Sequence, residues 1–230
     1  PTDPVPWYVT SDGVGTHQTA PGTLAFGLDH DGVGDVIVTF TGVGSFRGSG
    51  ALLPGGQHVL TAAHVVENAG STPDSGTVTF ETPGGDIVAT ISSFNIHPNY
   101  SGDLTEGYDL AVLELSSVVA SSVPRYDIYR GSNDIQPGVD QIKVGYGKSG
   151  IGSTGHDDPN DGLSSGTKRA GLNSYDMEGR EMLSDLGGGS NPFGDETNEL
   201  PPEGATSAYD FDSGNAENDV FTYGPWNEPA

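Results

Sequence analysis

The chain has 230 residues, with 8 Lys and Arg against 32 Asp and Glu, so its formal net charge at pH 7 is −24. A surface this acidic repels polyanions, which excludes nucleic acid and anionic membranes as partners. The sequence has no cysteine, which excludes disulfides, thiol catalysis and cysteine-based zinc sites. Its 36 glycines and 16 prolines favour short strands joined by turns over long helices.

The beginning of the chain is rich in proline and glycine, and we interpret residues 1–23 as an N-terminal extension lying over the surface. Residues 29–35 then alternate aspartate and glycine ahead of an apolar strand. Carboxylates at this spacing can ligate calcium, although the closing glutamate of a full ligand set is missing. A hairpin turn rich in Asp and Gly is the alternative. We therefore expect no required cofactor and leave structural calcium open.

Residues 24–122 contain six strand-like segments separated by turns such as Pro-Gly-Gly. The segments are residues 36–40, 48–53, 58–60, 77–80, 86–91 and 110–115. We expect them to close a first antiparallel β-barrel.

One histidine within this barrel is held by unusual surroundings. Residues 59–66 run from a short apolar strand through Ala62 and Ala63 to His64. Small residues let the backbone pack tightly, so the scaffold fixes the imidazole. A histidine that ends a strand and has no catalytic role is the alternative interpretation.

A carboxylate lies at the start of another predicted strand. Asp109 precedes a segment that is apolar at nearly every position. Burying a carboxylate there is costly unless it is paired and hydrogen-bonded. A histidine that donates its Nδ1–H is the natural partner, and the pair then forms a general base. A strand-start cap or turn residue is the alternative for Asp109 alone.

The chain also carries three longer motifs in order: Leu60-Thr61-Ala62-Ala63-His64, His97-Pro98-Asn99-Tyr100 and Asp109-Leu110-Ala111-Val112-Leu113. Together they resemble the histidine and aspartate blocks of trypsin-like (chymotrypsin-fold) serine peptidases, including secreted bacterial members. Three motifs in the right order are specific, whereas Ala-Ala-His alone is not. Relatives commonly have a cysteine directly after the histidine, where this chain has Val65.

The resemblance implies an all-β fold with two six-stranded antiparallel barrels, the second incomplete in this chain. It also implies a secreted, extracellular serine endopeptidase that acts on proteins or peptides through a His-Asp-Ser triad and an acyl-enzyme. In that scheme His64 is the general base and then the general acid, and Asp109 orients its imidazole.

Residues 123–230 would form the second barrel. Residues 141–147 resemble the strand that opens it, and strand character returns at residues 166–173 and 207–212. The loop between the first two of these strands carries a second weak calcium candidate, for which a solvated loop is the alternative. Its members are Asp157, Asp158, Asn160 and Asp161.

The nucleophile is not evident. Asp212-Ser213-Gly214 matches only part of the family's Gly-Asp-Ser-Gly-Gly, because Phe211 and Asn215 replace two of its glycines. A phenylalanine there should spoil the oxyanion hole, which needs a backbone conformation that a β-carbon resists. We therefore expect the nucleophilic serine beyond Ala230, or on a C-terminal second chain, with Ser213 as the alternative. A non-catalytic, peptidase-like binding protein without a nucleophile is the rival function.

Overall fold

The structure is a computed structural model that describes residues 30–102, 107–131, 140–147, 150–151, 155–156, 165–166, 168–174, 177–178 and 207–208. Within these residues the chain is all-β, with one turn of 3₁₀ helix, η1 (Ala63–Val65). No helix among them is long and apolar enough to cross a membrane. The predicted N-terminal extension lies outside the described residues.

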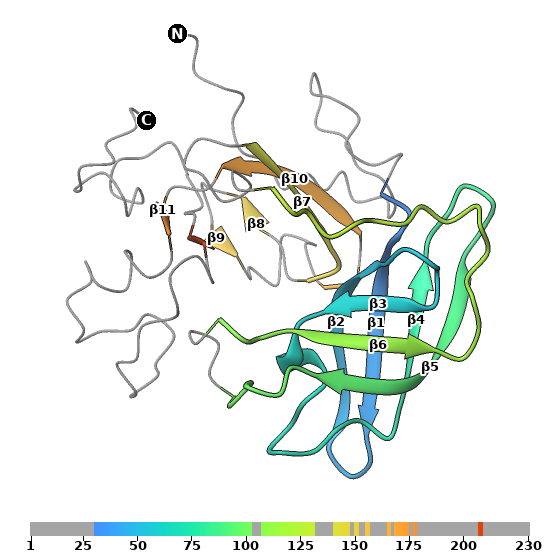
Figure 1. Cartoon of the computed structure of the whole chain (residues 1–230), viewed down its shortest axis with the longest axis vertical. Coiled ribbons are helices and arrows are strands. Elements are labelled where there is room, and N and C mark those ends of the chain that lie inside the picture. Colours follow the sequence, from blue (N-terminus) through green and yellow to red (C-terminus); the bar gives the residue numbers. More distant parts are fainter. Residues whose placement is uncertain are drawn as a thin grey trace, which may run out of the picture.

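Six antiparallel strands form a closed barrel in the order β1-β2-β3-β6-β5-β4 (Figure 1). Their bounds are β1 (Val33–Phe40), β2 (Gly44–Leu52), β3 (His58–Thr61), β4 (Ser75–Phe80), β5 (Ile87–Ile96) and β6 (Ala111–Leu115). The predicted all-β fold and six-stranded first barrel are confirmed. All six strands fall within residues 24–122, while the domain boundaries themselves stay predictions.

The core of the barrel follows from the alternation of side chains along its strands. In β6, Ala111, Leu113 and Leu115 are buried and the residues between them are partly exposed. Val36 and Val38 of β1 are buried by the same alternation. Closing the sheet on itself leaves these strands without an unpaired edge. Apolar packing and complete strand pairing therefore stabilise a barrel that has no disulfide.

A glycine in β2 lets the turn η1 rest against the barrel wall. A β-carbon added to Gly48 would lie 2.6 Å from Cγ2 and 2.7 Å from Cγ1 of Val65. Val65 is buried, so its side chain occupies the space that any larger residue at position 48 would need. This contact fixes the position of η1, and with it His64.

Strand β5 is longer than the sequence predicts. The expected strand ended at residue 91, whereas β5 continues to Ile96 through a shift of register between Ile91 and Ser93. Ser92 is the extra residue at this bulge, and its hydroxyl donates to the carbonyl oxygen of Glu114 at 3.0 Å. A bulge interrupts the alternation of apolar and polar residues, which hides the continuation of the strand from sequence reasoning.

Beyond the barrel, three two-stranded sheets are described. Strand β7 (Asp140–Gly145) pairs with β10 (Arg169–Ser174), β8 (Gly150–Ile151) with β9 (Gly155–His156), and β11 (Met177–Glu178) with β12 (Ser207–Ala208). Strands β7, β10 and β12 overlap the strands expected near residues 141–147, 166–173 and 207–212. The second barrel over residues 123–230, and its incompleteness, stay predictions.

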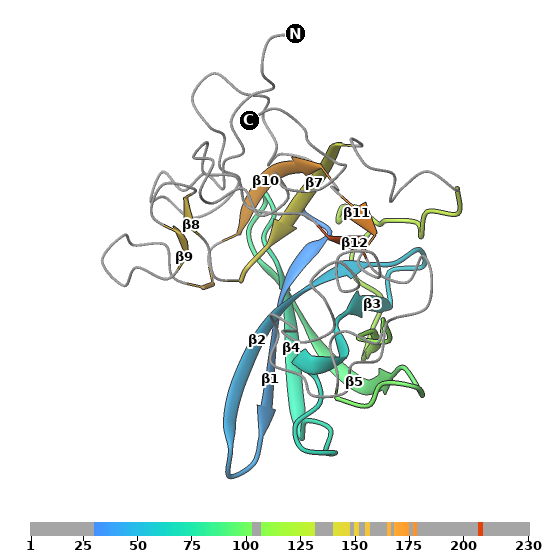
Figure 2. The same ribbon diagram turned by 90° about the vertical axis from the view of Figure 1, so that its left-hand side faces the viewer.

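Polar contacts tie β7 and β10 to the first barrel, beyond one end of β1 (Figure 2). The Tyr146 backbone N–H donates to the Ser49 hydroxyl at 2.8 Å. Lys168 is only 2% exposed, and its Nζ lies 3.4 Å from the carbonyl oxygen of Glu81 and 3.9 Å from Oδ1 of Asp31. Burial lowers the pKa of Lys168, and the nearby carboxylates oppose that effect. A buried ammonium group therefore joins the two parts of the chain.

We expect Gly48→Ala to destabilise the barrel by about 1–3 kcal/mol, because its methyl group would overlap Val65. Urea unfolding measures this loss, and adding Val65→Ala should recover part of it. Gly84→Ala is the matched control, since its β-carbon would lie 3.7 Å from the nearest atom. A loss in Gly48→Ala no larger than in this control would contradict the proposed contact.

Candidate active site

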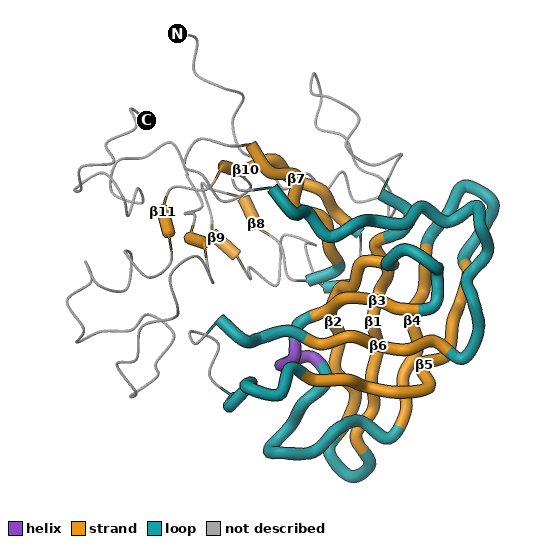
Figure 3. The backbone as a smooth tube through the Cα atoms, viewed as in Figure 1, coloured by secondary structure: helices purple, strands orange, loops and turns teal. Residues whose placement is uncertain are grey.

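The register of two neighbouring strands brings His64 and Asp109 to the same end of the barrel. Strands β3 and β6 are antiparallel, with Thr61 opposite Ala111. Since β3 ends where β6 begins, the residues after Thr61 and those before Ala111 emerge together. His64 lies in η1 just after β3, and Asp109 comes two residues before β6. Figure 3 shows η1 beside the start of β6 and the end of β5.

Asp109 holds His64 at two points. The Nδ1 atom of His64 lies 2.6 Å from Oδ2 of Asp109, and the His64 backbone N–H donates to Oδ1 at 2.8 Å. The side chain of His64 is 52% exposed, and that of Asp109 is 21% exposed. Because Nδ1–H donates to the carboxylate, the neutral ring carries its free lone pair on Nε2. The arrangement provides an oriented proton acceptor in contact with solvent.

The two groups shift each other's protonation in opposite directions. The hydrogen bond to Asp109 raises the pKa of His64 above its ordinary value of 6.5, against the lowering effect of burial. Burial raises the pKa of Asp109, but the hydrogen bonds from the ring and backbone of His64 outweigh this and hold it below 3.8. The carboxylate is therefore ionised at neutral pH and stabilises a protonated imidazole.

The chain around His64 is held by buried small residues. The hydroxyl of Thr61 donates to the Ser49 carbonyl oxygen at 2.8 Å, which ties the end of β3 to β2. Ala63 is fully buried, and its carbonyl oxygen accepts from the Val66 N–H at 2.9 Å. A larger residue at position 63 would require the core to move, which explains the small residues before the histidine.

The His97 motif supports Asp109 from the side of β5. The rings of His97 and Tyr108 are stacked, with centroids 5.1 Å apart and planes 9° apart. The His97 N–H donates to the Leu110 carbonyl oxygen at 2.9 Å, and Nδ1 of His97 accepts from the Asn99 N–H at 3.2 Å. Tyr108 and Leu110 flank Asp109, so these contacts fix its backbone. The sequence indicated the His97 motif only as part of the resemblance to a family. It did not predict that His97 and Tyr108 support Asp109.

The remaining predicted site residues do not join the pair. Oδ1 of Asp35 accepts from Nε of Arg47 at 3.0 Å, and Asp31 lies beside Lys168. No group of three or more His, Asp or Glu side chains suited to a metal ion occurs in the described part of the chain. Ser213 and the second calcium candidate at residues 157–161 lie outside the described residues.

With this geometry in view, the chain was compared with known proteins. The family model described as Trypsin matches residues 31–183. The chain belongs to the trypsin family. That match covers all six barrel strands, η1 and the sheet formed by β7 and β10.

Solved structures share the trypsin-family fold at low sequence identity. The structure of GrC is 16% identical, with a TM-score of 0.54, and the match covers 77% of this chain and 70% of that one. The HL collagenase structure is 15% identical, with a TM-score of 0.52, and the match covers 68% of this chain and 62% of that one. Comparison with curated protein sequences gives no match. The family and the fold together support a peptidase.

We expect the pKa of His64, followed by NMR of its ring protons, to lie above 6.5 in the wild type and to fall in Asp109→Asn. The stability contributed by protonated His64 is present below pH 6.5 and is lost as the pH rises through its raised pKa. The part contributed by ionised Asp109 is present above pH 3.8 and is lost as the pH falls through its lowered pKa.

Urea unfolding should therefore show that the free energy of unfolding of the wild type exceeds that of Asp109→Asn by the largest amount between pH 3.8 and 6.5. Asp127→Asn, which removes an exposed carboxylate between β6 and β7, is the matched control. An unchanged His64 titration in Asp109→Asn would mean that the pair does not form in solution.

We expect Asp35→Asn to leave the effects of calcium and of EDTA on the melting temperature unchanged to within about 2 °C. The reason is that Asp31 and Asp35 already face Lys168 and Arg47. Differential scanning fluorimetry with magnesium as the control measures both effects. A calcium-specific rise of many degrees that Asp35→Asn removes would show that these carboxylates bind the ion instead.

Proposed function

We propose that this chain supplies the general base of a serine endopeptidase that hydrolyses peptide bonds through an acyl-enzyme. The observation that carries the proposal is the two-point contact of Asp109 with the ring and backbone of His64. A ring held in this way has a fixed tautomer and presents Nε2 as a base. Membership of the trypsin family supports protein or peptide substrates and a secreted, extracellular protein.

In the proposed reaction, Nε2 of His64 takes the proton of a serine hydroxyl as its oxygen attacks the peptide carbonyl. Asp109 stabilises the imidazolium, which then gives the proton to the leaving amine as the C–N bond breaks. Water repeats these steps on the acyl-enzyme and releases the carboxylic acid and the free serine. His64 moves every proton in this scheme, so the reaction as proposed needs no cofactor.

We further propose that the nucleophilic serine lies outside these 230 residues, either later in a longer chain or on a second chain. Support comes from Phe211, which stands where the family's nucleophile motif has glycine. The oxyanion donor needs a backbone conformation that a β-carbon disfavours. A second chain would bind tightly, because strands missing from a second barrel would pair with exposed strand edges.

A non-catalytic binding protein is the second candidate function. The replacement of two motif glycines by Phe211 and Asn215 favours it, since both changes affect the only recognisable serine motif. In that case the His64–Asp109 pair would be retained without a nucleophile to activate. Labelling of the serine distinguishes the two functions.

We expect a fluorophosphonate to label a serine other than Ser213 in the protein as isolated from its source, together with any co-purifying chain. His64→Ala should abolish both labelling and peptide hydrolysis, because the serine loses its base, and Ser213→Ala should change neither. Mass spectrometry of the labelled peptide identifies the serine. Label on Ser213 would overturn the proposed location, and a folded protein with neither label nor hydrolysis would favour the binding protein.

A further inference from the structure

The part of the chain that builds the candidate site has no cationic side chain of its own. Between Arg47 and Arg125 the sequence contains no lysine or arginine. This segment includes β3, η1, β4, β5 and β6, and therefore both His64 and Asp109. Its acidic residues are Glu67, Asp74, Glu81, Asp86, Asp103, Glu106, Asp109 and Glu114. With histidine taken as neutral, the segment thus contributes only negative formal charge.

Three cations from other segments make internal contacts. Arg47 pairs with Asp35, and the guanidinium of Arg125 donates to the carbonyl oxygens of Val119 and Val123 at 2.9 and 3.2 Å. Lys168 is almost completely buried. These three side chains bind the protein itself. Arg47 and Lys168 lie beside the carboxylates of Asp35 and Asp31, so their positive charges are largely offset locally.

Arg130 is also exposed, and an acidic residue lies beside it. Arg130 and Asp127 line the same pocket of about 240 Å³ on the outer face of β3 and β6. Opposite charges in one pocket largely cancel at a distance. The exposed arginine therefore does not reverse the negative character of this face.

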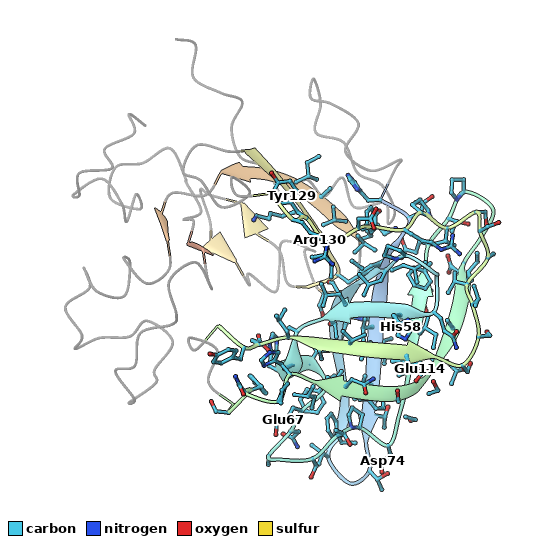
Figure 4. The ribbon with its side chains drawn as sticks, in the orientation of Figure 1. His58, Glu67, Asp74, Glu114, Tyr129 and Arg130 are labelled. Atoms are coloured by element: carbon cyan, nitrogen blue, oxygen red, sulfur yellow. The ribbon has the colours of Figure 1, made fainter. Side chains whose placement is uncertain are left out.

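Two acidic side chains of this segment are fixed by backbone donors, and Figure 4 shows Glu67 close to η1 and Asp74 at the end of the barrel where β1 ends. Glu67 follows His64 by three residues, and its carboxylate accepts from the Gly70 N–H. Asp74 accepts from the Thr41 N–H at 2.6 Å, and this hydrogen bond lowers the pKa of its carboxyl group. Both carboxylates are therefore held by backbone donors, and they add to the charge of Asp109.

Building on the function proposed above, we propose that the site prefers polybasic substrates, meaning protein segments rich in lysine and arginine. The negative field raises the local concentration of such segments and speeds their encounter with the site. Fields of this kind change association rates by about 10–10³-fold. The net charge of −24 supplies the long-range part, and the cation-free segment around His64 supplies the part close to the reacting bond.

The test compares three fluorogenic peptides that share one uncharged cleavable core and differ in their Lys, Ser or Glu tails. At about 10 mM ionic strength the Debye length is about 30 Å, and we expect kcat/KM to fall from the Lys to the Ser to the Glu peptide. The Lys and Glu peptides should differ by at least about 10-fold. Near 1 M salt the Debye length is about 3 Å, and the difference should vanish. Equal values at low salt would overturn the proposal and leave solubility as the role of the acidic surface.

A matched pair of variants tests the contribution close to the site. Glu67→Gln removes a charge three residues after His64 and keeps an acceptor for Gly70. Asp86→Asn removes a charge just before β5, and the ten residues of this strand span about 30 Å. At about 0.1 M ionic strength the Debye length is about 10 Å, so only nearby charges act strongly.

Under these conditions Glu67→Gln should lower kcat/KM for the Lys peptide by about 2–3-fold and leave the Ser peptide unchanged. Asp86→Asn should change neither value by more than about 1.5-fold. An unchanged preference in Glu67→Gln would contradict a field centred on the site.

Failure of this inference is distinguishable from failure of the proposed function. If the Ser peptide is not hydrolysed at any salt concentration, the peptidase function fails, and fluorescence anisotropy then measures binding of the same peptides to the wild-type protein. Salt-dependent binding of the Lys peptide alone would support the polybasic preference. Hydrolysis of all three peptides at equal rates, or equal binding where none is cleaved, would overturn it.

Discussion

The double contact between Asp109 and His64 is the constraint on which the rest of the site depends. A single hydrogen bond to the ring would fix a distance and leave the ring free to turn with its backbone. The second bond, from the backbone N–H to the same carboxylate, also fixes η1 relative to β6. Asp109 therefore holds both the imidazole and the segment that carries it. Its charge can remain partly buried because both oxygens accept hydrogen bonds.

The barrel supports this contact from three directions without any covalent link. Val65, the residue after His64, packs over Gly48. Thr61, three residues before His64, donates a hydrogen bond from its hydroxyl to the Ser49 carbonyl oxygen. The stacked rings of His97 and Tyr108 hold the backbone that leads into Asp109. Each contact joins segments that belong to or adjoin different strands, so the geometry of the pair depends on strand register. In a chain without cysteine, that register depends on packing and hydrogen bonds alone.

Much of the fold and the central pair were predictable from the sequence, because the signals were local. Ala62-Ala63-His64 and the apolar run after Asp109 each lie within a few residues, and their order matched a known pattern. The contacts that position the pair were not predictable, because each joins residues distant in sequence. Nothing near Gly48 indicates that Val65 will cover it, and nothing near Tyr108 identifies His97 as its partner. The bulge at Ser92 was missed because an extra residue inverts the alternation on which strand prediction relies.

The position of β6 in the barrel also has a consequence for biosynthesis. Strand β6 is the last of the six strands in the chain, yet it lies between β3 and β5, which appear before it. The nascent barrel therefore stays open until Leu115 has left the ribosome. Strand β6 closes the sheet between β3 and β5, and Asp109, two residues before it, contacts His64 in the closed barrel. Closure of the barrel and the contact between Asp109 and His64 therefore both depend on the last part of the barrel sequence, and a chain that ends before residue 109 lacks both.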